Sequence, residues 1–304
     1  MAFAFIEEVD AVATLTASTA TDEPLPAWGD SPSGDYDIGR QVITPSTHQV
    51  WESAVDNNAT DPLAPGPGHE EDWLLVGYTN RYRMYDQSPQ SQTTMADSLA
   101  VTHQPGAYIK ALALLEVDAA TVTVQQHTEV TNELYSRTFD MISDVGIYDY
   151  DEYFFAPVGR RTDLYVNDLK PYAEASLTVI FESAAGEDVS CGVLKFGREI
   201  VIGNTQYGGR VGIEDYSVKQ VDEFGQATIL ERAFNRTGDY TLILTPAQVD
   251  PAYTNLGAIR ATPVVFVADP DYGACLLYGF LKDFAVEFAG PTHAYANISI
   301  KGLA

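Results

Sequence analysis

Short runs in which apolar and polar residues alternate dominate the middle of the chain. Thr121–Val124 and Leu177–Ile180 alternate or nearly so, as half-buried strands require. Turn formers separate them from other runs rich in β-branched and aromatic residues, and this spacing predicts a sandwich or jelly roll over residues 80–203. The other runs are Tyr108–Leu115, Leu164–Val166, Ser176–Phe181 and Val189–Phe196.

The last hundred residues contain the clearest helix signal. Thr245 can cap a helix, Pro246 suits its first position, and Gln248 can complete a capping box. Pro263 prevents the helix from continuing much beyond Ala261. The spacing predicts one short amphipathic helix with a single apolar face. The residues of that face are Val249, Tyr253, Leu256 and Ile259.

After this helix, the pattern predicts an antiparallel sheet. Val264–Val267 is a buried type of strand, and a longer strand with a bend at Gly279 follows a turn. Two segments then alternate cleanly, so each has one buried and one wet face. Their apolar residues are Phe284, Val286 and Phe288 in the first segment and Ile298 and Ile300 in the second. The glycine-rich stretch Gly203–Gly209 is expected to separate this part from the preceding sandwich.

The first 79 residues differ from the rest because prolines and turn formers interrupt them repeatedly, so long helices cannot form there. We expect short strands and loops. The sequence therefore predicts a mainly β protein of three parts. These are a small aromatic-rich β module (1–79), a central jelly-roll-like β-sandwich (80–203), and a C-terminal antiparallel β domain with one helix (204–304).

Charge limits the classes of partner. The 304 residues include 43 Asp and Glu against 17 Lys and Arg, a net charge of -26, which repels phosphate backbones and anionic lipids. Tight nucleic-acid binding is therefore not expected. Residues 1–79 hold fourteen acidic residues against one basic residue, Arg40. The excess acid has two interpretations: solubility, or a conduit wall that DNA passes without sticking.

The cysteines, the N-terminal stretch and the short apolar runs indicate that the protein folds in a cytosol. Cys191 and Cys275 both lie in apolar runs, so no disulfide framework is expected. The N-terminal stretch lacks a basic leader, and no apolar run approaches the ~18 residues of a membrane span. We therefore expect neither secretion nor membrane insertion.

A search for catalytic patterns favours a protein that is not an enzyme. The sequence has no nucleophile elbow and no phosphate-binding glycine loop followed by Lys-Ser/Thr. Its histidines, His48, His69, His103, His127 and His293, lack the spacing of metal ligands. We expect no cofactor and no metal. A glycan-cleaving enzyme that uses paired carboxylates stays as an alternative.

Aromatic residues in the first 79 positions form the one constellation with a positive functional meaning. Tryptophan and tyrosine faces stack on sugar rings, so the candidate carbohydrate-binding residues are Trp28, Tyr36, Trp51 and Trp73. The order of these residues resembles the chitin- and cellulose-binding modules of families 5 and 12, although Trp51 stands where a tyrosine is usual. The alternative is that the tryptophans form only the small core of this module.

A second resemblance covers the chain from about Trp28 to the C-terminus. Thr79–Asp86, Tyr207–Ser217 and Glu231–Phe234 are similar to segments of virion proteins of long-tailed bacteriophages. The last hundred residues also resemble the tail-tube fold that forms rings in tail tubes and distal tail proteins.

This resemblance implies a structural component of the tail tip or baseplate, a virion protein synthesised in the host cytoplasm. Its implied partners are other tail proteins (tail tube, hub and fibres) and further copies of itself in a homo-oligomeric ring. Contact with a host-surface glycan is a further expectation. The alternative function is a carbohydrate-binding adhesion protein.

Overall fold

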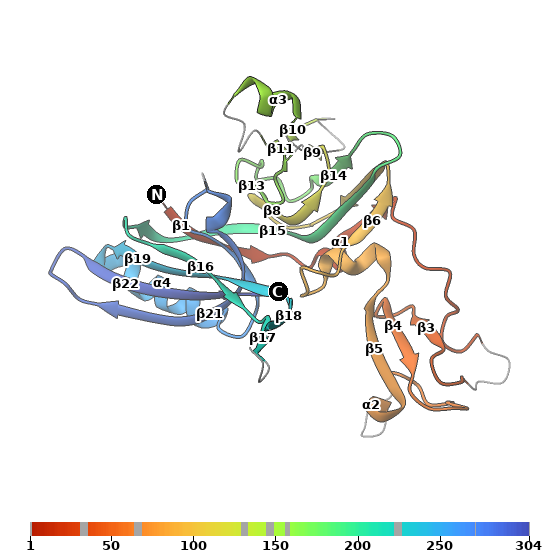
Figure 1. The fold of residues 1–304 in the computed structure, drawn as a ribbon. Helices are drawn as coiled ribbons and strands as arrows, with labels where there is room; N and C mark the ends of the chain where they lie inside the picture. The colour runs from red at the N-terminus through yellow and green to blue at the C-terminus, as the bar shows by residue number, and fades with distance from the viewer. Residues whose placement is uncertain are drawn as a thin grey trace.

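The structure is a computed structural model that describes residues 2–30, 36–63, 69–128, 133–143, 149–155, 159–221, 227–270 and 272–303. Within them, a ten-stranded, a five-stranded and a three-stranded sheet make up most of the fold (Figure 1). This confirms the predicted mainly β class. The longest helix, α4 (Pro246–Ala258), lies in the C-terminal part, as expected.

The ten-stranded sheet runs through most of the molecule and is antiparallel at every described pairing. Its order is β13 (Leu164–Val166), β8 (Ala111–Asp118), β15 (Asp188–Thr205), β1 (Ala2–Glu8), β20 (Val264–Val267), β21 (Leu276–Glu287), β22 (Ala294–Gly302), β19 (Phe234–Leu244) and β16 (Arg210–Asp215). The short strand β6 (Thr93–Ala96) pairs with β15 outside this order.

Strand β1 occupies an interior position in this sheet. Phe5 lies opposite Ile200 of β15 on one side and Phe266 of β20 on the other. Phe3, Phe5 and Ile6 are fully buried. The expectation that residues 1–79 form one small module therefore does not describe residues 2–8, whose near-continuous apolar run is typical of a strand covered on both faces.

The five-stranded sheet covers one half of the large sheet. Its order is β10 (Tyr135–Asp140), β9 (Thr121–His127), β14 (Ser176–Glu182), β7 (Ser98–His103) and β2 (Leu15–Ser18). Alternate residues of these strands, such as Val122, Val124 and Val179, meet Leu112, Leu114 and other residues of β8 and β15 in one core. The predicted sandwich and its alternating strands are confirmed.

Helix α4 covers the C-terminal half of the large sheet. The predicted cap forms, because the Gln248 side chain accepts the Thr245 backbone N–H at 2.9 Å. Leu256 is buried against β19–β22, and Val249 and Ile259 pack beside it. Tyr253 is instead exposed, so its place on the predicted apolar face was wrong; Ala252 is buried on the helix.

Strands β21 and β22 pair as predicted, with Phe284 opposite Ile298. Phe288 is the exception, since it lies beyond the end of β21 and is exposed. The register shift in β21 falls between Leu281 and Asp283 and not at the predicted bend. Gly279 instead permits close approach of two strands, because a Cβ there would stand 2.1 Å from the Lys301 carbonyl oxygen.

The expected boundary at Gly203–Gly209 falls partly inside a strand. β15 continues through Gly203 to Thr205, pairs with β1 along its second half and reaches β19 at its end. The turn is confined to Gln206–Gly209. Whether the parts 1–79, 80–203 and 204–304 fold separately stays a prediction, although the large sheet takes strands from all three.

A three-stranded sheet forms the small module, in the order β3 (Gln41–Thr44), β4 (Gln49–Ser53) and β5 (Trp73–Tyr78), with the short helix α2 (His69–Asp72) before β5. It joins the sandwich through the 3-10 helix η1 (Asn80–Tyr85). The Asn80 side chain donates to Thr21 O at 2.9 Å and to Thr94 O at 2.8 Å. The rings of Tyr82 and His48 are stacked, with their centroids 3.7 Å apart. The junction is therefore a packed contact.

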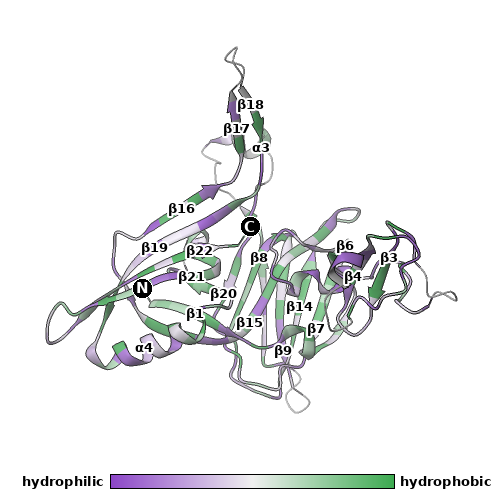
Figure 2. Ribbon diagram, turned by 90° about the horizontal axis from the view of Figure 1, so that it is seen from below, coloured by the Kyte–Doolittle hydropathy of each residue, from purple (hydrophilic) through white to green (hydrophobic). Residues whose placement is uncertain are grey.

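The remaining elements are short. They are α1 (Ala11–Thr14), β11 (Ile142–Ser143), α3 (Tyr150–Phe155), β12 (Gly159–Arg160), β17 (Val218–Val221), β18 (Ala227–Leu230) and the 3-10 helix η2 (Gly273–Cys275). Figure 2 shows the β17–β18 hairpin projecting from the body beyond β16 and β19, with hydrophobic positions along β18.

Candidate functional site

Two of the four predicted sugar-binding aromatics lie inside the small module. Tyr36 and Trp73 are 1% and 2% exposed and meet edge to face, with ring centroids 5.7 Å apart. Trp73 Nε1 donates to Thr60 O, and Tyr36 OH accepts from Gly29 N, each at 2.8 Å. These rings, with Val42, form the core of the module, so they have no face to offer a ligand.

Trp28 and Trp51 pack against this core but stay partly exposed. Their indole N–H groups are buried and have no hydrogen-bond partner among the described residues. Of the predicted set, only these two rings retain surface that a sugar could contact. Their role in binding stays a prediction.

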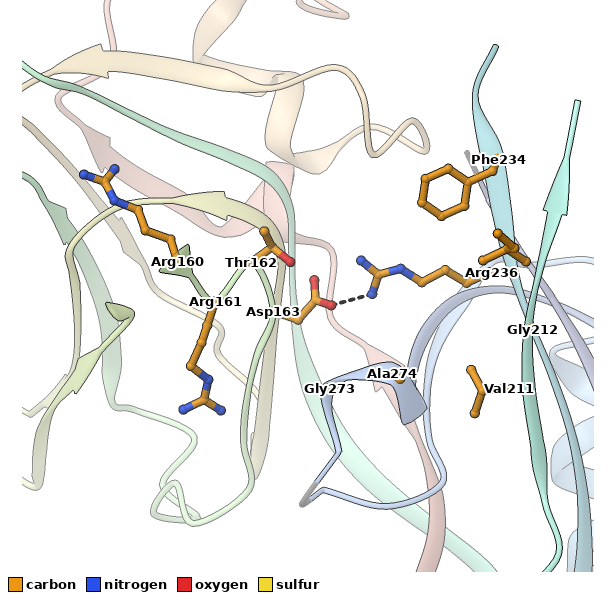
Figure 3. A pocket seen from close by; sticks show the side chains of 11 residues that line it. Arg160, Arg161, Thr162, Asp163, Val211, Gly212, Phe234, Arg236, Gly273 and Ala274 are labelled. Carbon is orange, nitrogen blue, oxygen red and sulfur yellow. Dashed lines mark hydrogen bonds and ion pairs between the residues drawn. The ribbon is translucent and has the colours of Figure 1, made fainter. Parts of the chain in front are cut away.

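One pocket lies where the sandwich meets the C-terminal part, and we call it the seam pocket (Figure 3). It encloses about 700 Å³. Arg160–Asp163, at the end of β12 and just after it, form one wall. Residues of β16 and β19 form the other, with Gly273 and Ala274 of η2 between them. The volume falls within the range of roughly 300–1,000 Å³ that is typical of ligand pockets.

Strand register explains the apolar wall of the seam pocket. Residues directly opposite in an antiparallel pair share a face, and Val211 and Ile213 lie opposite Gly238 and Arg236. Phe234 is on the same face, two residues from Arg236. All three apolar side chains line the pocket while staying 43%, 70% and 51% exposed.

Ion pairs hold the two walls in place. Arg236 of β19 bonds to Asp163 and, at 3.1 Å, to Glu116 of β8. Burial disfavours the charge of Arg236, but Asp163 and Glu116 together outweigh this effect and raise the pKa of the guanidinium. Burial also raises the pKa of Glu116, against the attraction of Arg236. The arginine thus links the ribbon β16–β19 to the sandwich.

Most charged side chains that line the seam pocket are paired with each other or with neighbouring groups. Arg160 pairs with Asp118 and Glu187. Asp163, the carboxylate that lines the pocket, is held by Arg236. Arg161 has no acidic partner among the residues described. The pocket therefore presents one uncompensated cation beside an apolar wall, which suits an apolar segment with a negative charge.

A smaller cavity of about 310 Å³ contains a partly buried ion pair that the sequence did not indicate. Lys195 Nζ lies 3.2 Å from Glu8 Oε2, and Tyr85 lines the same cavity. Burial raises the pKa of Glu8, while Lys195 opposes the rise. Because 187 positions separate the two residues, only the pairing of β1 with β15 brings them together. Acid and amine bond to each other, so the pair joins two strands.

No group of three or more His, Cys, Asp or Glu side chains in the described ranges could hold a metal ion. Likewise, no helix in the described part of the chain has the length and hydrophobicity to span a membrane. Cys191 is buried and Cys275 partly buried, and neither forms a disulfide.

No protein-family model matches the chain, and no curated protein matches it either. A solved structure with some similarity is chitosan-binding module 1 of a chitosanase/glucanase from Paenibacillus sp., in a selenomethionine-labelled variant. The identity is 12%, over 40% of this chain and 85% of that one, with a TM-score of 0.26. This score is too low to assign a fold or a function. The observed class is a mainly β protein with a two-sheet sandwich and one C-terminal helix.

Proposed function

We propose that the protein is a structural component of a multisubunit assembly, the tail tip or baseplate of a long-tailed bacteriophage, and that it acts by contact and not by catalysis. The observation that carries this proposal is the apolar face of the ribbon β16–β19, formed by Val211, Ile213 and Phe234. A free monomer would leave this face in water, whereas a neighbouring subunit would cover it.

The position of the ribbon supports assembly. β16 is the last strand of the ten-stranded sheet, so one of its edges has no strand beside it in the described structure. Such an edge is a template for pairing with another chain. The hairpin beyond it adds Ile229 and Leu230, which are also exposed. A neighbouring subunit that pairs with the edge of β16 and covers this apolar face would bury main-chain groups and side chains in one interface.

A second exposed apolar cluster supports assembly through two different faces. Tyr150, Phe154 and Phe155 of α3 are all more than half exposed, and Figure 1 shows α3 at a distance from β16. A subunit with two unlike adhesive faces associates head to tail, which closes into a ring when the rotation per subunit allows it. The expected homo-oligomeric ring is consistent with this arrangement.

The direct test measures the mass of the purified protein in solution by light scattering and images it by electron microscopy. We expect oligomers that Ile213→Lys or Phe234→Asp reduces to monomers. Ile38→Lys is the matched control, because Ile38 is similarly exposed (63%) but lies in the small module. A wild-type chain that stays monomeric at all concentrations would contradict assembly.

Localisation needs its own experiment. An antibody raised against the purified protein should label one end of the tail in micrographs of particles that carry its gene. Absence of the protein from purified particles would refute the virion assignment, even if the protein forms oligomers in solution.

Recognition of a host-surface glycan is a second candidate function, favoured by the exposed parts of Trp28 and Trp51 on the small module. Trp51→Phe keeps the packing of the core but shrinks the ring, so it should weaken binding on a glycan array without unfolding the module. Unchanged or absent binding would leave these tryptophans with a packing role alone.

A further inference from the structure

A third pocket lies beside the turn between β15 and β16, and we call it the tyrosine pocket. It encloses about 250 Å³ between Thr205–Gly209 on one side and Ala268, Asp269, Tyr272 and Cys275 on the other. The Thr205 hydroxyl donates to Ala268 O at 3.0 Å, and Gln206 N donates to Thr241 O at 2.8 Å. The first bond joins the two sides, and the second fixes the turn to β19.

Glycines shape the turn. Gly208 has φ +105°, a conformation that side-chain-bearing residues rarely adopt. A Cβ on Gly209 would stand 2.8 Å from a ring carbon of Tyr240, so only glycine lets the turn lie directly on that ring. The pair Gly208–Gly209 therefore lets the turn that carries Tyr207 pass close to the Tyr240 ring.

Two aromatic rings flank the pocket and remain in solvent. Tyr207 is 91% exposed and Tyr272 62% exposed, and both line the pocket. Neither hydroxyl has a hydrogen-bond partner in the described part of the chain. Tyrosine pairs an apolar ring with a polar tip, so two such rings at one pocket mouth provide faces for stacking and hydroxyls for hydrogen bonding.

Polar groups also line the pocket. Gln206 contributes an exposed amide, and Asp269 contributes a buried carboxylate. Burial raises the pKa of Tyr240, whose hydroxyl lies close to the Cys275 thiol, a weak acceptor, and has no stronger partner among the described residues. Amide, carboxylate and hydroxyl groups beside aromatic rings match a ligand that carries several hydroxyls around an apolar ring face.

We propose that the tyrosine pocket binds one neutral sugar ring of a surface polysaccharide. The C–H face of the ring stacks on Tyr207 or Tyr272, and its hydroxyls bond to Gln206 and Asp269. A volume below the roughly 300 Å³ of drug-sized sites suits a single ring at a chain end or branch. The carboxylate of Asp269 and the net charge of -26 disfavour uronic and sialic acids.

This inference shares its ligand class with the glycan-recognition candidate, but it uses different residues and does not require assembly. Failure of the two proposals can therefore be told apart. The tryptophan site predicts sensitivity to Trp51→Phe, and the tyrosine pocket predicts sensitivity to Tyr207→Ala and Tyr272→Ala.

The test uses the full chain on an array of bacterial surface oligosaccharides, followed by saturation-transfer NMR with glucose, galactose and N-acetylglucosamine. We expect binding to neutral rings, with a loss on the order of tenfold in Tyr207→Ala and in Tyr272→Ala, as removal of one aromatic contact should cause. Tyr253→Ala is the matched control, since Tyr253 is 70% exposed on α4 and does not line the pocket.

Both substituted tyrosines are exposed, so the variants should unfold at the wild-type temperature, and thermal unfolding checks this. Binding that is absent for every neutral sugar, that prefers acidic sugars, or that survives both tyrosine substitutions would overturn the proposal. Loss of binding in Tyr253→Ala to the same extent would also contradict it.

Discussion

At the scale of single residues, two titratable groups, His103 and Glu8, connect the stability of the fold to pH. His103 is fully buried in the sandwich, where its Nε2 lies 3.0 Å from the Tyr85 hydroxyl and its Nδ1 lies 3.4 Å from the Thr14 hydroxyl. Burial lowers the pKa of His103 from 6.5 to about 4. The folded protein therefore holds this imidazole neutral over a range in which the unfolded chain would protonate it.

The first prediction concerns the acid side of stability. The pKa of His103 is lower in the folded protein than in the unfolded chain. The neutral imidazole therefore stabilises the fold fully above pH 6.5, and about 3 kcal/mol of this stability is lost as the pH falls toward 4. The His103→Gln variant should lose less stability over this interval than the wild type. Urea unfolding at several pH values measures the difference, and parallel curves for the two proteins would contradict it.

The second prediction concerns the pair Glu8–Lys195. Lys195→Met removes the positive charge and leaves the partly buried carboxylate of Glu8 without its partner, so the free energy of unfolding at pH 7 should fall by about 1–3 kcal/mol. The raised pKa of Glu8 determines how this loss of stability depends on pH. The loss is present above that pKa and becomes smaller at lower pH, where the carboxyl is protonated. The double variant Glu8→Gln, Lys195→Met should recover most of the loss; equal damage in both variants would argue against this explanation.

At the scale of elements, local sequence signals predicted α4 and the pair β21–β22, because the cap at Thr245 and the alternation around Phe284 and Ile298 act within a few residues. β1 was not predicted. Its position depends on partners nearly two hundred residues away, and short apolar runs do not reveal which strand they will pair with. The sequence also did not predict that Gly279 allows β21 and β22 to approach closely. A glycine in a strand is compatible with either a bend or a close approach, so the residue type alone does not distinguish them.

The third prediction compares two glycines. Gly279→Ala should destabilise the protein by about 1–3 kcal/mol or more, because the added Cβ meets the backbone of β22. Gly257→Ala, in α4, has nothing within 4 Å and should stabilise by about 0.4–1 kcal/mol. Chemical unfolding of both variants checks the contrast. A Gly279→Ala protein as stable as the wild type would mean that β21 and β22 lie farther apart.

For the candidate sites, the sequence indicated an aromatic module but not which of its rings would be buried. Tyr36 and Trp73 became core and Trp28 and Trp51 stayed partly exposed, because a sugar platform and a small core require the same residue types. The seam pocket and the tyrosine pocket each combine segments far apart in the chain, such as Arg161 with Ile213 or Tyr207 with Tyr272. No local pattern could have indicated them.

At the scale of the whole molecule, the large sheet connects two cores. One lies between the two sheets of the sandwich, and the other lies between the large sheet and α4. β1 belongs to the second core through Phe3 and Phe5, and its Ile6 packs on the opposite face of the sheet with Ala111 and Val193. The sandwich and the C-terminal part therefore share a strand.

The fourth prediction tests whether these parts unfold together. Phe5→Ala removes a fully buried ring beside Phe266 and should cost about 3–5 kcal/mol. If the shared sheet couples the two cores, calorimetry should show the unfolding of the sandwich and of the C-terminal part moving to lower temperature together. Two separate transitions, of which only one moves, would show independent domains with a boundary near residue 203.

The central place of β1 also bears on how the protein is made. A ribosome releases β1 well before β15, and β20 later still, so this strand waits for both neighbours while the rest of the chain is synthesised. Until Val264–Val267 emerge, the nascent sheet has an open gap bordered by apolar strand edges. Efficient production should therefore depend on chaperones that shield the N-terminal segment, and translation that stops before residue 264 should yield aggregates.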